Sequence, residues 1–595
     1  MRLTKSLFID FCDYPKLARW KANNPLVYKN IRKIETEEQE EHIIAIGQAV
    51  EDKVKELLEM RYNPDKSRIG QKALDLMPRF HKLKNEDDDD DDSVLIKAEL
   101  DLPNALSDTI EAIRNQEQIL YQPTFKYWDC LVRADFMVWN GKGYDLIEVK
   151  AKSRIRKEVT DDGEKKAIWS IESKFINDAS FQVYVINKAL EQCSLWQIHN
   201  TYFAYLNKEY TKQWPLDIYQ LIIQDLAWEE RELEVIQRNK PTKIIVNDAL
   251  LSYKDIETKL EQMRSFLSLS EAEANKYFLR SWTRYLEYFW EDKPFWTVMG
   301  MGIHHSNASY IQDLYYEDNT ALLDLTTEEI EWFNDNAQQF IARYKQCKRS
   351  WLPIINKARI KEVFDGFSYP ICFYDYESIN VPVPFMDNTR PYMQTIVQYS
   401  MHKYYQDGSM KHYGWVFVWE WEYSCKQIQI ENNPNAVEYE NDRAITGSYK
   451  DLLMQMIDDI GEDLYSSTFI VRHEWFENSR NKEIAKLFPD LADAFLAINN
   501  NTYDLKKIVA EWYYFDIACK WSASIKKVLP VLVPDMSYEG IDIGRWDIAM
   551  MALHKLITNE TPVHERDQII KHLLLYCWQD TIAMVRIYEA LKELI

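Results

Sequence analysis

Charged side chains interrupt two otherwise apolar segments of the sequence at two-residue spacing. In YDLIEVKAK, Glu148 stands two positions before Lys150. In CFYDYES, Asp375 stands two positions before Glu377. Side chains two residues apart on a β-strand point to the same face of the sheet. We therefore expect each pair to project together from one side of a strand.

The first pair suits hydrolysis of a phosphodiester bond. Asp135 lies on the strand before the turn Asn140–Gly143, and Glu148 and Lys150 lie on the strand after it. Two carboxylates could hold a divalent metal ion, while an ammonium group positions the attacking water. Glu-x-Lys occurs at five other places in the chain, so an exposed cross-strand ion pair is the alternative interpretation.

The second pair consists of two acids in a strand that should be buried. Buried carboxylates without partners are costly, and shared metal ions relieve their repulsion. A two-metal site needs further carboxylates, which must come from elsewhere in the chain. The alternative interpretation is that DYE is a turn and YCWQD an ordinary helix with one buried tyrosine.

The elements that must position the first pair are predicted by periodicity. Helical spacing of apolar residues spans 36–60 and 177–193, and aromatic alternation at 201–210 indicates a strand. The turn at 140–143 predicts an antiparallel hairpin. A small α/β domain over residues 1–215 would contain all of these pieces.

The remaining chain predicts two further regions. Residues 216–360 have few turn signals and suggest a mainly helical connector, whereas residues 361–595 combine buried strands with a long closing helix and suggest an α/β domain. The acidic run Glu86–Asp92 repels itself and is predicted to be an exposed loop.

Net charge, cysteine spacing and hydropathy limit the binding partners and the cellular compartment that we expect for the protein. A formal net charge of -23 over 595 residues excludes a generally basic polyanion-binding protein, so any nucleic-acid surface must be local. The eight cysteines form no C-x-x-C pair, which favours reduced thiols. No leader pattern and no window of about 18 apolar residues is found, so we expect a cytoplasmic protein without a membrane partner.

Local basic clusters accompany both pairs. Lys152 and Arg154 follow the first pair, and Lys526 and Lys527 stand in the C-terminal region. Such residues could track a phosphate backbone. Solvated surface is the alternative interpretation for each cluster.

The segment RADFMVWNGKGYDLIEVKAKS, followed by DASFQVYVINKAL, resembles the PD-(D/E)XK nucleases of the RecB/AddB type. The resemblance implies a restriction-endonuclease-like α/β core that uses Mg²⁺ or Mn²⁺. It makes Asp135 and Glu148 metal ligands, Lys150 the catalytic lysine and Gln182 a helix residue that orients the site. Position 186 is isoleucine, where the family has tyrosine.

The same resemblance bears on two further positions near the N-terminus. An early helix of these nucleases often supplies one more metal ligand, and Glu51 follows Gly47 at the family's spacing. A surface glutamate is the alternative interpretation. Some members bind an iron–sulfur cluster, but Tyr14 stands where the first cysteine would be, so no cluster is expected.

The C-terminal motifs resemble the DnaQ-like, DEDD-type 3′–5′ exonucleases of the ribonuclease H-like fold. Asp375-Tyr376-Glu377 matches their first motif, and Tyr576 with Asp580 matches their last. The middle motif normally ends in aspartate, where this chain has Glu477. The resemblance implies that the four acids hold metal ions and that Tyr576 orients the attacking water.

The wider C-terminal sequence, including RPYMQTIVQYSMHKY and YCWQDTIAMV, resembles a bacterial family that fuses a RecB-like nuclease to a ribonuclease H-like domain. It implies a metal-dependent nuclease with two active sites in DNA processing, repair or defence. A nucleic-acid-binding or scaffold protein with one or both nuclease folds inactive is one alternative. A 3′ exonuclease acting on RNA is the other.

Overall fold

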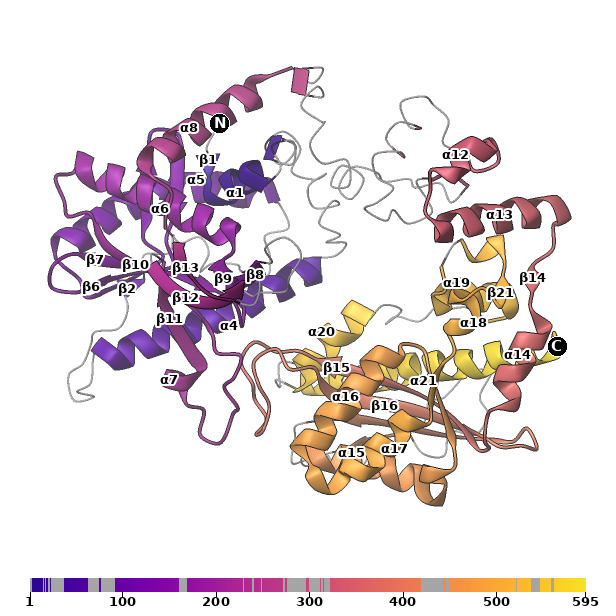
Figure 1. The fold of residues 1–595 in the computed structure, drawn as a ribbon. Helices are drawn as coiled ribbons and strands as arrows, with labels where there is room; N and C mark the ends of the chain where they lie inside the picture. The colour runs from indigo at the N-terminus through magenta and orange to yellow at the C-terminus, as the bar shows by residue number, and fades with distance from the viewer. Residues whose placement is uncertain are drawn as a thin grey trace. The chain divides into compact units, whose positions relative to one another are not determined.

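The chain divides into two compact units in a computed structural model. Unit 1 comprises Met1–Tyr277 and Val381–Tyr392, and unit 2 comprises Phe278–Asn380 and Met393–Ile595. Both are α/β, with mixed sheets and helices (Figure 1). The structure describes residues 3–13, 15, 18–19, 22, 37–62, 74–75, 91–159, 168–227, 230–237, 240–247, 249–270, 273–274, 296–298, 311, 314, 321–418, 442–445, 449–520, 522–536, 546–557 and 561–595.

These units differ from the three predicted domains. Unit 1 continues past residue 215 because β11 (Ile222–Leu226) pairs with β10 (Ile198–Leu206) and α8 (Tyr253–Ser268) packs into the unit 1 core. The connector predicted over 216–360 is not mainly helical at its start. Strands β12 (Glu230–Gln237) and β13 (Lys240–Asn247) form an antiparallel hairpin there.

A six-stranded sheet forms the centre of unit 1, with the order β11-β10-β7-β6-β3-β2. The predicted hairpin is confirmed, since β6 and β7 are antiparallel and Phe136 faces Ile147. β7 also pairs in parallel with β10, so it lies inside the sheet. The remaining bounds are β2 (Leu74–Asp75), β3 (Ile119–Tyr121), β6 (Phe136–Trp139) and β7 (Tyr144–Lys150).

Helices cover both faces of this sheet. The predicted helices are confirmed as α4 (Glu37–Tyr62) and α6 (Ser173–Gln192). Tyr144 and Leu146 of β7 pack in the core that contains α6, whereas Ile147 packs with α4. Because strand side chains alternate, Glu148 and Lys150 project on the α6 side.

The N-terminal segment also packs on α6. Phe8 of α1 (Lys5–Asp13) stacks on Phe181 of α6 with ring centroids 4.8 Å apart. β1 (Leu3–Thr4) pairs with β5 (Cys130–Arg133), which pairs with β4 (Thr124–Tyr127). These contacts fix the start of α1 beside the sheet. The smaller elements of unit 1 are α5 (Asp91–Arg114), β8 (Arg156–Val159), β9 (Ile168–Ile171) and α7 (Ile218–Leu221).

The acidic run differs in part from the predicted loop. Asp91 and Asp92 open helix α5. The rest of the run lies outside the described residues.

A second six-stranded sheet, of order β18-β17-β16-β15-β19-β20, forms the centre of unit 2. The predicted strand in PICFYDYES is confirmed as the central β15, antiparallel to β16 and parallel to β19. The bounds are β15 (Ile371–Ile379), β16 (Thr395–Tyr404), β17 (Met410–Phe417), β18 (Asp442–Ile445), β19 (Thr468–Val471) and β20 (Thr502–Asp504).

Helices again cover both faces (Figure 1). On one face the Tyr376 hydroxyl donates to Asn481 of α16 at 3.0 Å. On the other face Phe373 packs on Tyr588 of α21, with ring centroids 5.7 Å apart. The principal helices are α15 (Tyr449–Ile460), α16 (Glu474–Leu487) and α21 (Val563–Glu593), and the last two confirm predicted helices.

Smaller elements complete unit 2. They are α12 (Thr327–Glu331), α13 (Asp335–Ser350), β14 (Ile354–Ile355), α14 (Lys357–Asp365), α17 (Ala492–Asn500), α18 (Lys507–Ala510), β21 (Tyr514–Phe515), α19 (Ile525–Leu532) and α20 (Trp546–Ile557). Over the described parts of both units no helix is long and apolar enough to cross a membrane. Every described cysteine is a free thiol, as predicted; Cys425 lies outside the described residues.

A buried pair of histidines holds α21 against the sheet. His402 of β16 stacks on His412 with ring centroids 4.5 Å apart, and its Nδ1 lies 2.9 Å from Oγ1 of Thr581. Burial, reinforced by the neighbouring His412 and Arg586, lowers the pKa of His402 well below its usual 6.5. A proton on this imidazole is therefore unfavourable in the folded chain.

Replacing His402 by Asn should reduce the sensitivity of unit 2 to acid. The unfolded chain takes up a proton at this position near pH 6.5, whereas the lowered pKa keeps the folded chain from doing so. Stability therefore falls as pH drops below this value, by up to about 1.4 kcal/mol per pH unit. Chemical denaturation from about pH 7.5 to about pH 5 measures the difference. The same change at the exposed His564 is the control, and an equal effect there would contradict the assignment.

Candidate active sites

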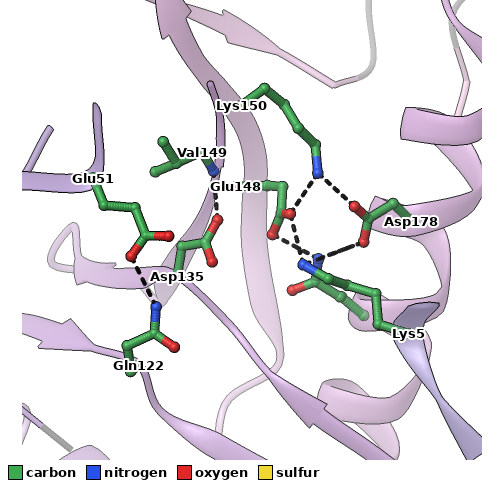
Figure 2. Close-up of polar contacts among 9 residues, drawn as sticks. Lys5, Glu51, Gln122, Asp135, Glu148, Val149, Lys150 and Asp178 are labelled. Atoms are coloured by element: carbon green, nitrogen blue, oxygen red, sulfur yellow. Dashed lines mark hydrogen bonds and ion pairs between the residues drawn. The ribbon is translucent and has the colours of Figure 1, made fainter. Parts of the chain in front are cut away.

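Glu148 lies at the centre of a buried polar network in unit 1 (Figure 2). Lys150 Nζ donates to Glu148 Oε1 at 2.6 Å and to Asp178 Oδ2 at 2.5 Å. Lys5 Nζ donates to the same Oε1 at 2.8 Å and lies 3.6 Å from Asp178 Oδ1. Two ammonium groups therefore contact two carboxylates.

Gln182 joins these carboxylates from helix α6. Its Nε2 donates to Glu148 Oε2 at 2.6 Å and to Asp178 Oδ1 at 2.8 Å. Asp178 lies four residues earlier on the same helix, which places the two side chains on one face. The predicted role of Gln182 in orienting this site is consistent with these contacts.

Asp135 and Glu51 lie at the other side of Glu148 (Figure 2). The amide of Val149 donates to Asp135 Oδ2 at 2.7 Å. Glu51 Oε2 accepts from the Tyr121 hydroxyl at 3.1 Å and from Gln122 Nε2 at 3.2 Å. Glu51 is half-buried and hydrogen-bonded, so its carboxylate is only partly exposed to solvent.

The charges of this network are balanced within the chain. Burial raises the pKa of Asp135 well above its usual range, and the neighbouring Glu148 raises it further. Burial also acts to raise the pKa of Glu148, but Lys150 and Lys5 outweigh it and hold that pKa well below its usual range. The ionised form is therefore favoured at Glu148 and disfavoured at Asp135.

This balance decides how well the residues fit a metal ion. Glu148 Oε1 already accepts from two ammonium groups. Within the described residues, the carboxylates of unit 1 do not converge as a group of three candidate ligands within 4.8 Å. A metal ion at Glu148 would have to displace Lys5. The arrangement brings the predicted residues together but does not present an open metal site.

The sequence alone did not identify two members of the network. Asp178 could have been found, because it lies one helical turn before Gln182 on the same face. Lys5 could not, since 143 residues separate it from Glu148 and only the packing of α1 brings them together.

Replacing both Lys5 and Lys150 by Met should destabilise unit 1 by more than the sum of the two single replacements. After either single change, one ammonium group still neutralises Glu148 and the repulsion between the two ammonium groups is relieved. The double change leaves the buried carboxylates without a cation. We expect an excess of about 1 kcal/mol in a double-mutant cycle of unfolding free energies.

The control for this cycle is Lys126→Met on β4, because this side chain is exposed. Combined with either Lys5→Met or Lys150→Met, it should give additive effects. Additivity for the Lys5 and Lys150 pair itself would show that the two ammonium groups do not share Glu148.

A second cluster of acids lies in unit 2. Asp375 and Glu377 project from β15, Glu477 comes from the first turn of α16, and Asp580 comes from α21. Glu377 and Glu477 are each only 2% exposed. In the described part of the chain, Asp375, Glu377 and Cys577 form the one group of candidate metal ligands whose donor atoms lie within 4.8 Å of one another.

The carboxylates of this cluster repel one another. Burial and then Asp580 raise the pKa of Asp375 to about 8. Burial, Asp375 and Asp580 raise the pKa of Glu377 well above its usual range. Burial and then Asp375 do the same for the pKa of Glu477. Each of these three acids thus has its pKa raised by acidic neighbours within the cluster.

Positive charge inside the chain does not balance this repulsion. Lys526 acts to lower the pKa of Glu377 and Arg472 that of Asp375, but both pKa values remain raised. Glu377 Oε2 and Glu477 Oε2 are buried and accept no hydrogen bond from the described part of the chain. Orphaned oxygens among repelling carboxylates are the donor set that a hard divalent cation requires. These residues fit a metal ion, in contrast to those of unit 1.

Two neighbours support the cluster. Tyr576 is buried, and burial followed by Asp580 raises the pKa of its phenol, so the hydroxyl stays protonated. Lys526 Nζ lies 5.7 Å from the centre of the Tyr576 ring. Asp504 Oδ2 accepts from the amide of Glu474 at 3.3 Å and so anchors the first turn of α16, from which Glu477 projects.

The candidate phosphate-binding residues lie on the surface. Lys152 and Arg154 are exposed directly after β7, and Lys526 and Lys527 are exposed in the first turn of α19. Of these, Lys526 is tied to a site by its position near Tyr576 and its effect on Glu377. Tyr14, on which the iron–sulfur expectation rests, lies outside the described residues.

Two comparisons with known proteins match parts of this chain. Residues 372–522 match a domain of unknown function, DUF2779. The chain is also similar to uncharacterized protein UU173 of Ureaplasma parvum serovar 3, with 26% identity over 252 residues. That match covers 38% of this chain and 31% of the relative. The matched domain includes Asp375, Glu377 and Glu477 and ends before Tyr576 and Asp580.

Proposed function

We propose that the protein is a metal-dependent nuclease that hydrolyses phosphodiester bonds of nucleic acids, DNA above all, at two sites. One observation carries the proposal. Four carboxylates from three separated elements of unit 2 lie close together, and the pKa of three of them is raised by the others. Two of their oxygens are buried without a hydrogen-bond partner among the described residues. Such an arrangement is costly unless a cation relieves it.

The residues around this cluster have roles that suit phosphodiester hydrolysis. Bound Mg²⁺ or Mn²⁺ would polarise the phosphate and activate a water molecule. Asp375, Glu377, Glu477 and Asp580 would hold the ions. Tyr576 keeps its proton and can donate a hydrogen bond that orients the attacking water.

Lys526 supplies the local positive charge that a phosphate needs at this site. Its side chain is exposed and lies beside Tyr576, so it can contact both solvent and substrate. A mixed sheet with helices on both faces is compatible with the ribonuclease H-like fold that the sequence motifs imply. This unit would trim a 3′ end.

The network of unit 1 would form the second hydrolytic site once a divalent ion takes the place of Lys5 at Glu148. Asp135, Glu148, Lys150 and Gln182 meet in one network, in the order that the PD-(D/E)XK resemblance requires. Lys150 is held at two carboxylates and could position a water molecule for attack. This unit would cut DNA in processing, repair or defence.

Replacing Asp375 by Asn together with Glu377 by Gln should abolish trimming from the 3′ end. The neutral amides keep the size of the side chains but lose the charge that holds a cation. We expect a loss of about 1000-fold or more, since a bound metal supplies several kcal/mol of transition-state stabilisation. The assay follows labelled single- and double-stranded DNA and RNA with Mg²⁺ or Mn²⁺.

Two controls make this assay decisive. Asp459→Asn is the same chemical change in the same unit, at a half-buried carboxylate that accepts from Tyr399 and Trp415, and should leave cleavage intact. Lys150→Ala should remove a different cleavage activity, that of unit 1. If neither active-site variant changes any cleavage pattern, the two-site nuclease is ruled out. Binding without cleavage by the wild type would favour the scaffold alternative.

A further inference from the structure

A thiol lies among the candidate metal ligands of unit 2. Cys577 of α21 is fully buried, and its Sγ lies within 4.8 Å of a carboxylate oxygen of both Asp375 and Glu377. It also lies three residues before Asp580, so the two side chains project from neighbouring turns of one helix. The ordinary explanation is that a buried cysteine packs as a small apolar side chain.

A second observation points to a ligand at this position. Glu377 is only 2% exposed, and its Oε2 makes no hydrogen bond with any described residue. A packing role for Cys577 explains the burial of the thiol but leaves this oxygen unsatisfied. A cation bound between the sulfur and the two carboxylates would satisfy it.

We propose that Cys577 is a direct ligand of the metal ion held by Asp375 and Glu377. The inference rests on the proposed function only in using the same cluster, because it concerns which ions bind. Thiolate with carboxylate oxygens is a ligand set for Zn²⁺ and similar thiophilic ions, whereas Mg²⁺ takes oxygen ligands. Cys577 therefore favours a thiophilic divalent ion at this position, while the four carboxylates keep the oxygen ligands that Mg²⁺ or Mn²⁺ needs in the proposed reaction.

Binding by the thiol has a defined proton balance. The Sγ–H bond is broken, the proton passes to solvent, and the sulfur electron pair forms the bond to the metal. No oxidation or reduction takes place. The charge of the thiolate adds to that of the carboxylates, which strengthens the attraction for a divalent ion in this water-poor region.

Cd²⁺ tests this ligand directly, since a thiolate bound to Cd²⁺ absorbs in the near ultraviolet. Titration of the full chain with Cd²⁺ should give a charge-transfer band that saturates and that is lost in Cys577→Ser and Cys577→Ala. The affinity for Cd²⁺, measured by calorimetry, should fall at least about tenfold in both variants. The affinity for Mg²⁺ should change little. Two substitutions are used so that a folding defect in one does not decide the result.

Cys372→Ser is the matched control, because Cys372 is fully buried on β15 of the same unit. It should keep the band and the affinity. Retention of both by the Cys577 variants would overturn the proposal, and so would the absence of a band in the wild type. Neither result touches the nuclease assay. Cleavage with Mg²⁺ that requires Asp375 would leave the proposed function standing even where the Cd²⁺ titration refutes this inference.

Discussion

Repulsion among the buried carboxylates of unit 2 is the constraint on which the account depends. Strand β15 directs Asp375 and Glu377 to the face covered by α21, which carries Asp580, and α16 brings Glu477 to the same place. The packing of α16 and α21 beside β15 therefore also brings these charges together. The cost of this arrangement is tolerated at functional sites, where a ligand relieves it.

In unit 1 the charge of the buried carboxylates is balanced by lysine side chains. The buried Glu148 is neutralised by Lys5, 143 residues away in the sequence, and by the nearby Lys150, which donate to the same oxygen. The first site is therefore balanced without an added ion, whereas the carboxylates of the second still repel one another. The two units would differ in their response to metal removal, because Lys526 and Arg472 do not offset the repulsion in unit 2.

The sequence predicts features that depend on residues close together in the chain, but not those that depend on contacts between distant segments. The apolar runs in YDLIEVKAK and CFYDYES were enough to predict β7 and β15, because a strand that is buried on both faces has few positions for charged residues. The position of Asp178, one helical turn before Gln182, is also visible in the sequence. Lys5 and the domain boundary have no such local signal, since the packing of α1 on α6 and the pairing of β10 with β11 are tertiary contacts.

The most direct measurement is calorimetric unfolding of the full chain with and without Mn²⁺, for the wild type and for Asp375→Asn with Glu377→Gln. Without metal, the variant should be at least as stable as the wild type, because the amides remove repulsion at nearly constant volume. Mn²⁺ should then raise the unfolding temperature of the unit 2 transition in the wild type alone, by mass action. A variant that is less stable without metal, with an equal response of both proteins to Mn²⁺, would contradict the account.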